Sequence, residues 1–140
     1  PVAEDYREEF DYLLAAHADC VAYKGSVPAG ESVGVLSGYL LLLLPTRYYG
    51  EGFPGTIVDA FSAGVPVVTS DWQNARSIVK DGQTGFIYGF DDSEGAYAIL
   101  DKCLGDPEMV VGMRGRCLEE SAKYTPDKAN EPIWSFVNQL

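Results

Sequence analysis

Two short apolar runs separated by a glycine-containing loop constrain the fold of this chain more than any other feature. The first run is five leucines at 40–44, and the second, Val-Pro-Val-Val-Thr, occupies 65–69. Each has the length of a β-strand, and the leucine run is typical of a strand covered on both faces. Between the runs, glycines at 50, 52 and 55 precede a helix predicted over 56–63, with Ile57, Ala60 and Phe61 facing inward. The order strand, loop, helix, strand predicts a βαβ unit whose loop lies at the carboxyl end of a parallel sheet.

The rest of the chain also alternates between strands and helices. We predict strands at about 21–23, 40–44, 66–69 and 86–88, and helices at 4–16, 31–37, 56–63, 74–80, 93–104, from 106 through 117 and from Pro132 onward. Ser93 and Asp106 are the predicted N-caps of two helices. The fold class is therefore α/β: a doubly wound, Rossmann-like parallel sheet with helices on both faces, in a single domain over 1–140. Because the chain opens on a helix, we expect the first one or two strands of such a fold to be missing.

Charge and composition argue against several kinds of partner. The formal net charge is −11, and the ten Lys and Arg residues do not cluster, so we expect no nucleic-acid partner. No apolar stretch approaches the ~18 residues of a membrane span. Three cysteines without a CxxC pair, beside a single histidine, predict reduced thiols in a cytoplasmic protein and no metal site.

The segment 50–59 combines residues that suit two kinds of ligand group. Gly52, Gly55 and Thr56 lie at a helix start, where main-chain N–H groups can bind phosphate and glycine lets a ligand approach closely. Glu51 and Asp59 would repel a phosphate, but carboxylates accept hydrogen bonds from neighbouring hydroxyls on a sugar ring. A ligand with both hydroxylated rings and a phosphate bridge is a nucleotide sugar.

At these residues the sequence resembles a known family. Glu51, seven further residues and Asp59, followed by Ala-Phe-Ser-Ala-Gly-Val-Pro-Val-Val at 60–68, are similar to a donor-site signature, Glu-x7-Glu. That signature belongs to the carboxyl-terminal, donor-binding domain of retaining GT-B glycosyltransferases of family 4 (group 1). The form Gly-Glu-Gly-Phe-Pro-Gly-Thr-Ile-Val-Asp-Ala-Phe at 50–61 further resembles members that assemble capsular or exopolysaccharide.

The resemblance implies a role for each matching residue. Glu51 is implied as the catalytic candidate, which contacts hydroxyls of the donor sugar near the reacting carbon. Asp59 matches the acid that binds the two ribose hydroxyls, although it is one methylene shorter than the usual Glu. The other implied donor-binding residues are Lys24, in a turn near the base, and Gly52, Phe53, Pro54, Gly55 and Thr56, which face the sugar and diphosphate.

The resemblance also implies a reaction and its partners. The sugar of a UDP- or GDP-sugar would be transferred with retention, without cofactor or metal, to a glycan or lipid-linked acceptor bound by an N-terminal domain. The parent protein would be cytoplasmic, with possible peripheral association at the inner face of the membrane. The family places an Arg and a Lys against the diphosphate, and this chain has no match for them, so we expect the chain alone to be inactive. At 75–77, Ala-Arg-Ser replaces the usual Asn and Glu.

Three other interpretations remain open. Thr56-x-x-Asp59 matches a capping box, in which Asp59 satisfies the helix start. Gly50-x-Gly52-x-x-Gly55, with Asp71 about twenty residues further on, fits an NAD(P)-type dinucleotide-binding fingerprint, but residues 46–49 separate the first apolar run from the glycines. A non-catalytic interaction module derived from the same fold would use an exposed sheet edge to pair with another chain.

Overall fold

The computed structural model describes residues 2–28 and 30–138, which form two compact units divided between Glu31 and Ser32. The first unit contains a short 3-10 helix, η1 (Glu4–Tyr6), and α1 (Arg7–Ala16). These elements confirm the helix predicted at 4–16. The strand predicted at 21–23 is wrong, because these residues form no ladder with any described strand, and a strand without a partner leaves its peptide groups unpaired.

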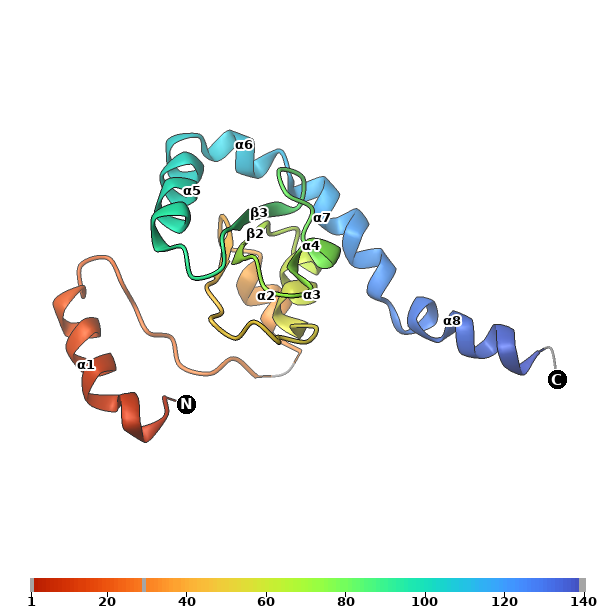
Figure 1. The fold of residues 1–140 in the computed structure, drawn as a ribbon, viewed down its shortest axis with the longest axis horizontal. Coiled ribbons are helices and arrows are strands. Elements are labelled where there is room, and N and C mark those ends of the chain that lie inside the picture. Colours follow the sequence, from red (N-terminus) through yellow and green to blue (C-terminus); the bar gives the residue numbers. More distant parts are fainter. Residues whose placement is uncertain (1, 29, 139–140) are drawn as a thin grey trace. The chain divides into compact units, whose positions relative to one another are not determined.

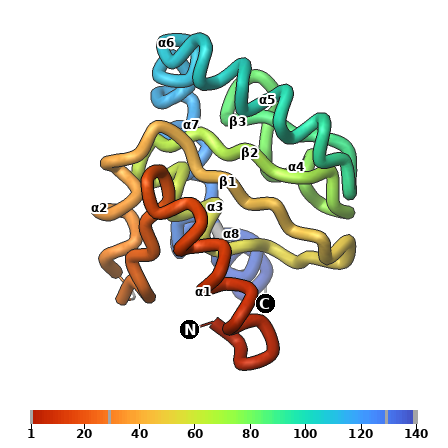
Figure 2. The backbone as a smooth tube through the Cα atoms, turned by 90° about the vertical axis from the view of Figure 1, so that its left-hand side faces the viewer, coloured from red at the N-terminus to blue at the C-terminus, as the bar shows by residue number. Residues whose placement is uncertain are grey.

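The second unit is built on a parallel sheet of β1 (Leu42–Leu44), β2 (Val67–Ser70) and β3 (Gly85–Tyr88), in that spatial order (Figures 1 and 2). Leu43 is in register with Val68, and Val68 with Phe86. The helices of this unit are α2 (Ser32–Leu36), α3 (Gly55–Ser62), α4 (Ala75–Ile78), α5 (Ser93–Gly105), α6 (Pro107–Val111), α7 (Arg114–Ser121), the 3-10 helix η2 (Ala122–Tyr124) and α8 (Pro126–Val137). The α/β fold class and three of the four predicted strands are thus confirmed.

Helices cover both faces of the sheet, as expected for a doubly wound fold. In Figure 1, α5 lies to the left of β2 and β3, whereas α3, α4 and α7 lie to their right. Side chains therefore alternate along β2 between two cores. Val67 points to the core that contains Ile57, Phe61 and Cys117. Val68 points to the core that contains Phe86, Cys103 and Val110, together with Tyr88 and Met113.

The leucine run is less covered than its composition suggests. Leu42 and Leu44 pack against the core beside α3, but the Leu43 side chain, which is directed to the opposite face, is 40% exposed. Helix α5 packs mainly on β2 and β3. The expectation of a strand covered on both faces is therefore wrong for Leu43.

Several helix ends differ from the sequence prediction. Asp106 caps α6 as predicted, but Asp92, not Ser93, caps α5 by accepting the Gly95 N–H at 2.9 Å. The single helix predicted through 117 is divided into α6 and α7, with Gly112 at the end of α6. Pro132 lies inside α8, which instead begins at Pro126 after the N-cap Thr125. A proline at the first helical position costs no hydrogen bond, which explains the earlier start.

The carboxyl end of α3 is fixed by a reverse turn and by a cation. Gly64 adopts a φ of 67°, which only glycine adopts without strain, and so lets the chain turn out of the helix. The Arg114 guanidinium donates to the carbonyls of Ser37 at 3.4 Å, Tyr39 at 3.5 Å and Ala63 at 3.4 Å. Ala63 is the C-cap of α3, so this contact holds the helix against the approach to β1.

Candidate donor site at the carboxyl end of the sheet

The loop between β1 and α3, residues 45–54, is held at the carboxyl ends of two strands. Ser70, the last residue of β2, donates from its hydroxyl to the Thr46 carbonyl at 2.6 Å. The Gln73 N–H donates to the Tyr49 carbonyl at 3.0 Å. These contacts confirm the predicted position of the loop at the carboxyl end of a parallel sheet.

Glu51 lies half-buried in this loop, and one of its carboxylate oxygens already has a partner. Thr46 Oγ1 donates to Glu51 Oε2 at 3.3 Å and accepts the Tyr48 N–H at 3.2 Å, so one hydroxyl orders both the turn and the carboxylate. Asn74 Nδ2 approaches the Glu51 carbonyl at 3.5 Å. Within residues 2–28 and 30–138, no Lys or Arg forms an ion pair with Glu51. The Oε1 atom is thus left to accept a hydrogen bond from a ligand.

Asp59 lies in the second turn of α3 and is likewise held at one oxygen. Ser32 Oγ, on α2, donates to Asp59 Oδ2 at 2.7 Å. The N-cap of α3 is Pro54, and no side chain caps the helix. The capping-box interpretation is therefore wrong: Thr56 lies inside the helix, and the Asp59 carboxylate is directed to Ser32.

The amino end of α3 is open. Gly55 is its first residue, and the Ile57 N–H donates to the carbonyl of the N-cap Pro54 at 3.0 Å. The N–H groups of Gly55 and Thr56, which precede it, have no acceptor within the helix. Gly52, Phe53, Gly55 and Thr56 are exposed, Pro54 is half-buried, and a Cβ placed on either glycine of this group would meet no atom within 4 Å. The main chain here is therefore accessible to a ligand.

The sequence-predicted residues are only partly brought together. Residues 51–56 form one continuous surface segment, and Asp59 follows on the same helix. No hydrogen bond joins Glu51 to Asp59 in the part of the chain that the structure describes, since each is bound to its own hydroxyl partner. Lys24 lies exposed in the first unit, so its assignment stays a prediction.

Sequence reasoning missed two residues that shape the site, Thr46 and Ser32. Thr46 accepts the N–H of the residue two positions further on, a turn for which threonine is a known local signal. Ser32 gives no such signal, because its partner is distant in sequence.

The dinucleotide interpretation required Asp71 to be free to bind a ribose. Instead, Arg76 Nε lies 3.0 Å from both Asp71 carboxylate oxygens, and a terminal guanidinium nitrogen lies 2.7 Å from Oδ2. This hydrogen-bonded pair raises the pKa of Arg76. In addition, α3 begins at the third glycine, ten residues after β1 ends, counting Pro45 to Pro54. The geometry does not favour a dinucleotide-binding turn.

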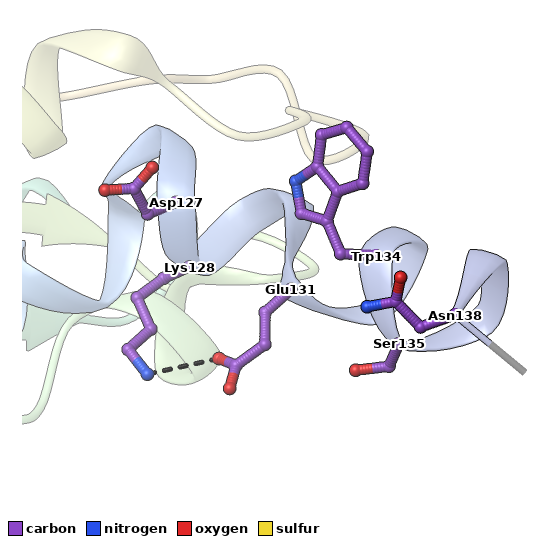
Figure 3. Close-up of a pocket in the computed structure, with 6 residues that line it drawn as sticks. All are labelled: Asp127, Lys128, Glu131, Trp134, Ser135 and Asn138. Carbon is purple, nitrogen blue, oxygen red and sulfur yellow. Dashed lines mark hydrogen bonds and ion pairs between the residues drawn. The ribbon is translucent and has the colours of Figure 1, made fainter.

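A hollow of about 350 Å³ lies on α8 and is unrelated to these residues (Figure 3). Its lining side chains all belong to α8 or directly follow it, so a single helix surface forms the hollow. Lys128 and Glu131 are paired there at 3.1 Å. No candidate donor residue lines it.

Comparison with known proteins decides the family. The family model described as "Glycosyl transferases group 1" matches residues 4–121. This chain belongs to the group 1 glycosyl transferases. The resemblance identified at 50–68 is thereby confirmed at the level of the family.

Individual group 1 relatives are similar over different shares of the chain. A phosphatidyl-myo-inositol mannosyltransferase of Mycolicibacterium smegmatis is 35% identical over 89 residues, which are 64% of this chain and 21% of that protein. The capsular polysaccharide biosynthesis glycosyltransferase CapM of Staphylococcus aureus is 26% identical over 138 residues, 96% of this chain and 35% of that protein. This chain thus spans about a fifth to a third of the length of these relatives. Among the residues described, no helix is both long and apolar enough to cross a bilayer.

Proposed function

We propose that residues 51–59 form the nucleotide-sugar site of a retaining GT-B glycosyltransferase of family 4. The observation that supports this most lies at the carboxyl end of a parallel sheet. There the start of α3 at Gly55, without a side-chain cap, lies in the same segment as the Glu51 carboxylate, which has no cationic partner among the described residues. In a member of the group 1 family, this arrangement suits a ligand that has both a diphosphate and sugar hydroxyls.

The diphosphate of the donor binds at the start of α3. The N–H groups of Gly55 and Thr56 point out of the first turn, and the helix dipole places partial positive charge there. Open space beside Gly52 and Gly55 lets phosphate oxygens reach the main chain. Phe53 and Pro54 border this cradle.

The two carboxylates bind hydroxyls. Glu51 uses Oε1 for a hydroxyl of the transferred sugar, since Oε2 is bound to Thr46, and Asp59 uses Oδ1 for the ribose, since Oδ2 is bound to Ser32. A carboxylate fixed at one oxygen presents the other in a defined direction, so less ordering is needed when the ligand binds. The assignment of Lys24 to the base stays a prediction from the resemblance.

The donor is a UDP- or GDP-sugar, and the reaction is a hexosyl transfer that needs no metal or cofactor. The bond from the anomeric carbon to the diphosphate oxygen breaks, a bond to an acceptor hydroxyl oxygen forms on the same face, and the hydroxyl proton leaves with the diphosphate. Glu51 stabilises the reacting sugar. The names of the relatives, a phosphatidyl-myo-inositol mannosyltransferase and a capsular polysaccharide glycosyltransferase, favour a glycan or lipid-linked acceptor. Such an acceptor, bound by a separate domain, suits a cytoplasmic protein at the inner face of the membrane.

These 140 residues bind the donor without efficient turnover. A diphosphate leaving group needs cations close to the developing charge. Arg47, inside the loop, and Arg76, the next arginine along the chain, are both exposed and paired with other residues: Arg47 with Asp91 at 2.7 Å and Arg76 with Asp71 at 2.7 Å. The start of α3 supplies only main-chain N–H groups.

A titration of the ¹⁵N-labelled chain with UDP-glucose and GDP-mannose, followed by NMR, tests the proposal. We expect one of them to shift the amide signals of residues 51–59 at about millimolar concentration. Glu51→Gln and Asp59→Asn should weaken this response. Glu119→Gln, at an exposed position of α7, is the matched control and should not. An absence of shifts with both donors, or shifts that centre on α8, would refute the donor site and favour an interaction module.

A further inference from the structure

The ring of Phe53, which borders the proposed diphosphate cradle, packs against the ring of Tyr124. The ring centroids are 5.0 Å apart, and the ring planes are inclined by 54°. Phe53 is otherwise exposed, with 51% of its surface accessible. Tyr124 is the last residue of η2, so a residue close to the end of the described chain contacts the loop between β1 and α3.

Tyr124 is itself firmly held. Its ring packs against the core that contains Phe61 and Cys117. Its hydroxyl donates to Glu120 Oε1 at 3.4 Å, and the other oxygen of Glu120 is bound by Lys123 Nζ at 2.6 Å. Glu120 is only 8% exposed. Burial, followed by the neighbouring Glu120 charge, raises the pKa of Tyr124, so the phenol keeps its proton at neutral pH.

The contacts that hold the loop between β1 and α3 lie at residues 46–51, before the segment 52–55 that carries Phe53. Phe53 is flanked by Gly52 and, after Pro54, by Gly55, and glycine gives the main chain a wide choice of conformations. A Cβ on either glycine would meet no neighbour, so the main chain here is not packed on that side. The Phe53 side chain is therefore the anchor between two flexible points.

We propose that Tyr124 is a positioning residue of the donor site: through Phe53 it fixes the segment 52–55, whose N–H groups receive the diphosphate. The inference rests on the proposed function for its ligand. It goes beyond the family assignment, because the family match ends at residue 121 and Tyr124 lies outside it.

Three substitutions separate this role from a general loss of stability. Tyr124→Leu removes the ring that packs on the core. Phe53→Leu removes the ring that belongs to the loop and leaves the core intact. Tyr124→Phe keeps the ring and removes only the hydroxyl. Tyr97→Leu, at a position of α5 that is 62% exposed, is the matched control.

We expect Tyr124→Leu and Phe53→Leu to weaken binding of the responding nucleotide sugar by about 3- to 10-fold, the usual range for one aromatic pair. The double variant should bind the nucleotide sugar as well as whichever single variant has the lower affinity, because both substitutions remove the same contact. Tyr124→Phe and Tyr97→Leu should bind like the unmodified chain. Melting temperatures, measured in parallel, ensure that each variant is compared in its folded state.

The ligand-free spectrum provides a second readout that does not depend on the donor. In both Leu variants, the amide signals of Gly52 and Gly55 should move or broaden relative to those of the Tyr97→Leu control. If these two signals and the affinity are unchanged in Phe53→Leu, Tyr124 does not position the loop. If the unmodified chain binds neither donor but the two signals still respond, the proposed function fails while the ordering of the loop by Tyr124 stands.

Discussion

The hydroxyl of Ser32 and the carboxylate of Asp59 are joined by a hydrogen bond of 2.7 Å that links α2 to the second turn of α3. This bond shows that Asp59 does not serve the helix start. It also leaves the residue with one oxygen committed and one oxygen available. The short helix α2 thus determines how the second acid of the donor-site signature is presented.

Ser32→Ala should lower the free energy of unfolding by about 1 kcal/mol, because a half-buried carboxylate loses a hydrogen-bond donor. Urea unfolding measures this loss. Ser37→Ala, which removes an exposed hydroxyl bound to the Gly34 carbonyl at 2.7 Å, is the matched control and should cost less. Equal losses for the two variants would mean that the Asp59 contact adds nothing specific.

Thr46→Val keeps the shape of the side chain but removes both hydrogen bonds that order the Glu51 turn. We expect the stability to fall by about 1 kcal/mol and the response to nucleotide sugar to weaken, since Glu51 is no longer oriented. Thr46→Ser retains the hydroxyl and should behave like the unmodified chain. Thermal unfolding and the NMR titration provide the two measurements. A Ser variant as impaired as the Val variant would point to packing of the methyl group instead.

Gly85→Ala should be severely destabilising. Gly85 has a φ of 154°, and a Cβ there would overlap the main chain of Val67, its partner in the β2–β3 ladder. Strain together with overpacking predicts a loss of about 3 kcal/mol or more. Gly105→Ala, at a site where a Cβ meets no atom within 4 Å, is the control and should leave unfolding nearly unchanged. A folded Gly85→Ala variant of normal stability would contradict the register of the sheet.

The three cysteines should differ sharply in reactivity. Burial raises the pKa of Cys117 from 9.0 to about 12 and also raises that of Cys103, whereas Cys20 is exposed. Because the thiolate is the reactive form, iodoacetamide at about pH 8 should label Cys20 alone in the folded chain and all three after denaturation. Mass spectrometry of the labelled peptides measures this. Early labelling of Cys117 would show that its core opens readily.

The raised pKa of Cys117 also predicts how the stability of the fold depends on pH. The folded chain holds the Cys117 proton that the unfolded chain releases near pH 9.0. The contribution of this thiol to the free energy of unfolding is therefore complete below that pH and is lost as the pH rises towards about 12. Cys117→Ala should reduce the loss of stability in this pH range without abolishing it, because the pKa values of Cys103 and Tyr124 are also raised, and the substitution also costs packing. Urea unfolding at several pH values provides the comparison.

The sequence was most informative where local pattern and tertiary environment agree. The apolar runs at 40–44 and 65–69 lead to the strands Leu42–Leu44 and Val67–Ser70, because each run is long enough to pair and to bury alternate side chains. The segment 21–23 has a similar composition but no partner strand among the described residues, and pairing is a property that no local pattern contains. Leu43 was misjudged for the same reason, since its exposure depends on how far α5 extends.

The residues of the candidate site also differ in whether the sequence alone could identify them. Glu51 and Gly55 could be found because a glycine-rich loop before a helix start is visible in sequence. The two residues that donate hydrogen bonds to Glu51 and Asp59 were not equally predictable from the sequence. Thr46 acts through a local turn and was within reach, whereas Ser32 meets Asp59 only because α2 packs on α3. The contact between Phe53 and Tyr124 is likewise visible only in the folded chain.

The guanidinium of Arg114 affects the charge at the carboxyl end of α3. It lies at the Ala63 carbonyl, where the partial negative charge of the helix accumulates. This permanent cation offsets the negative pole of α3 over its last turn, which is the range within which a helix dipole acts. The carbonyls that face the approach to β1 are thus neutralised locally, while the start of the helix at Gly55 keeps its own partial positive charge.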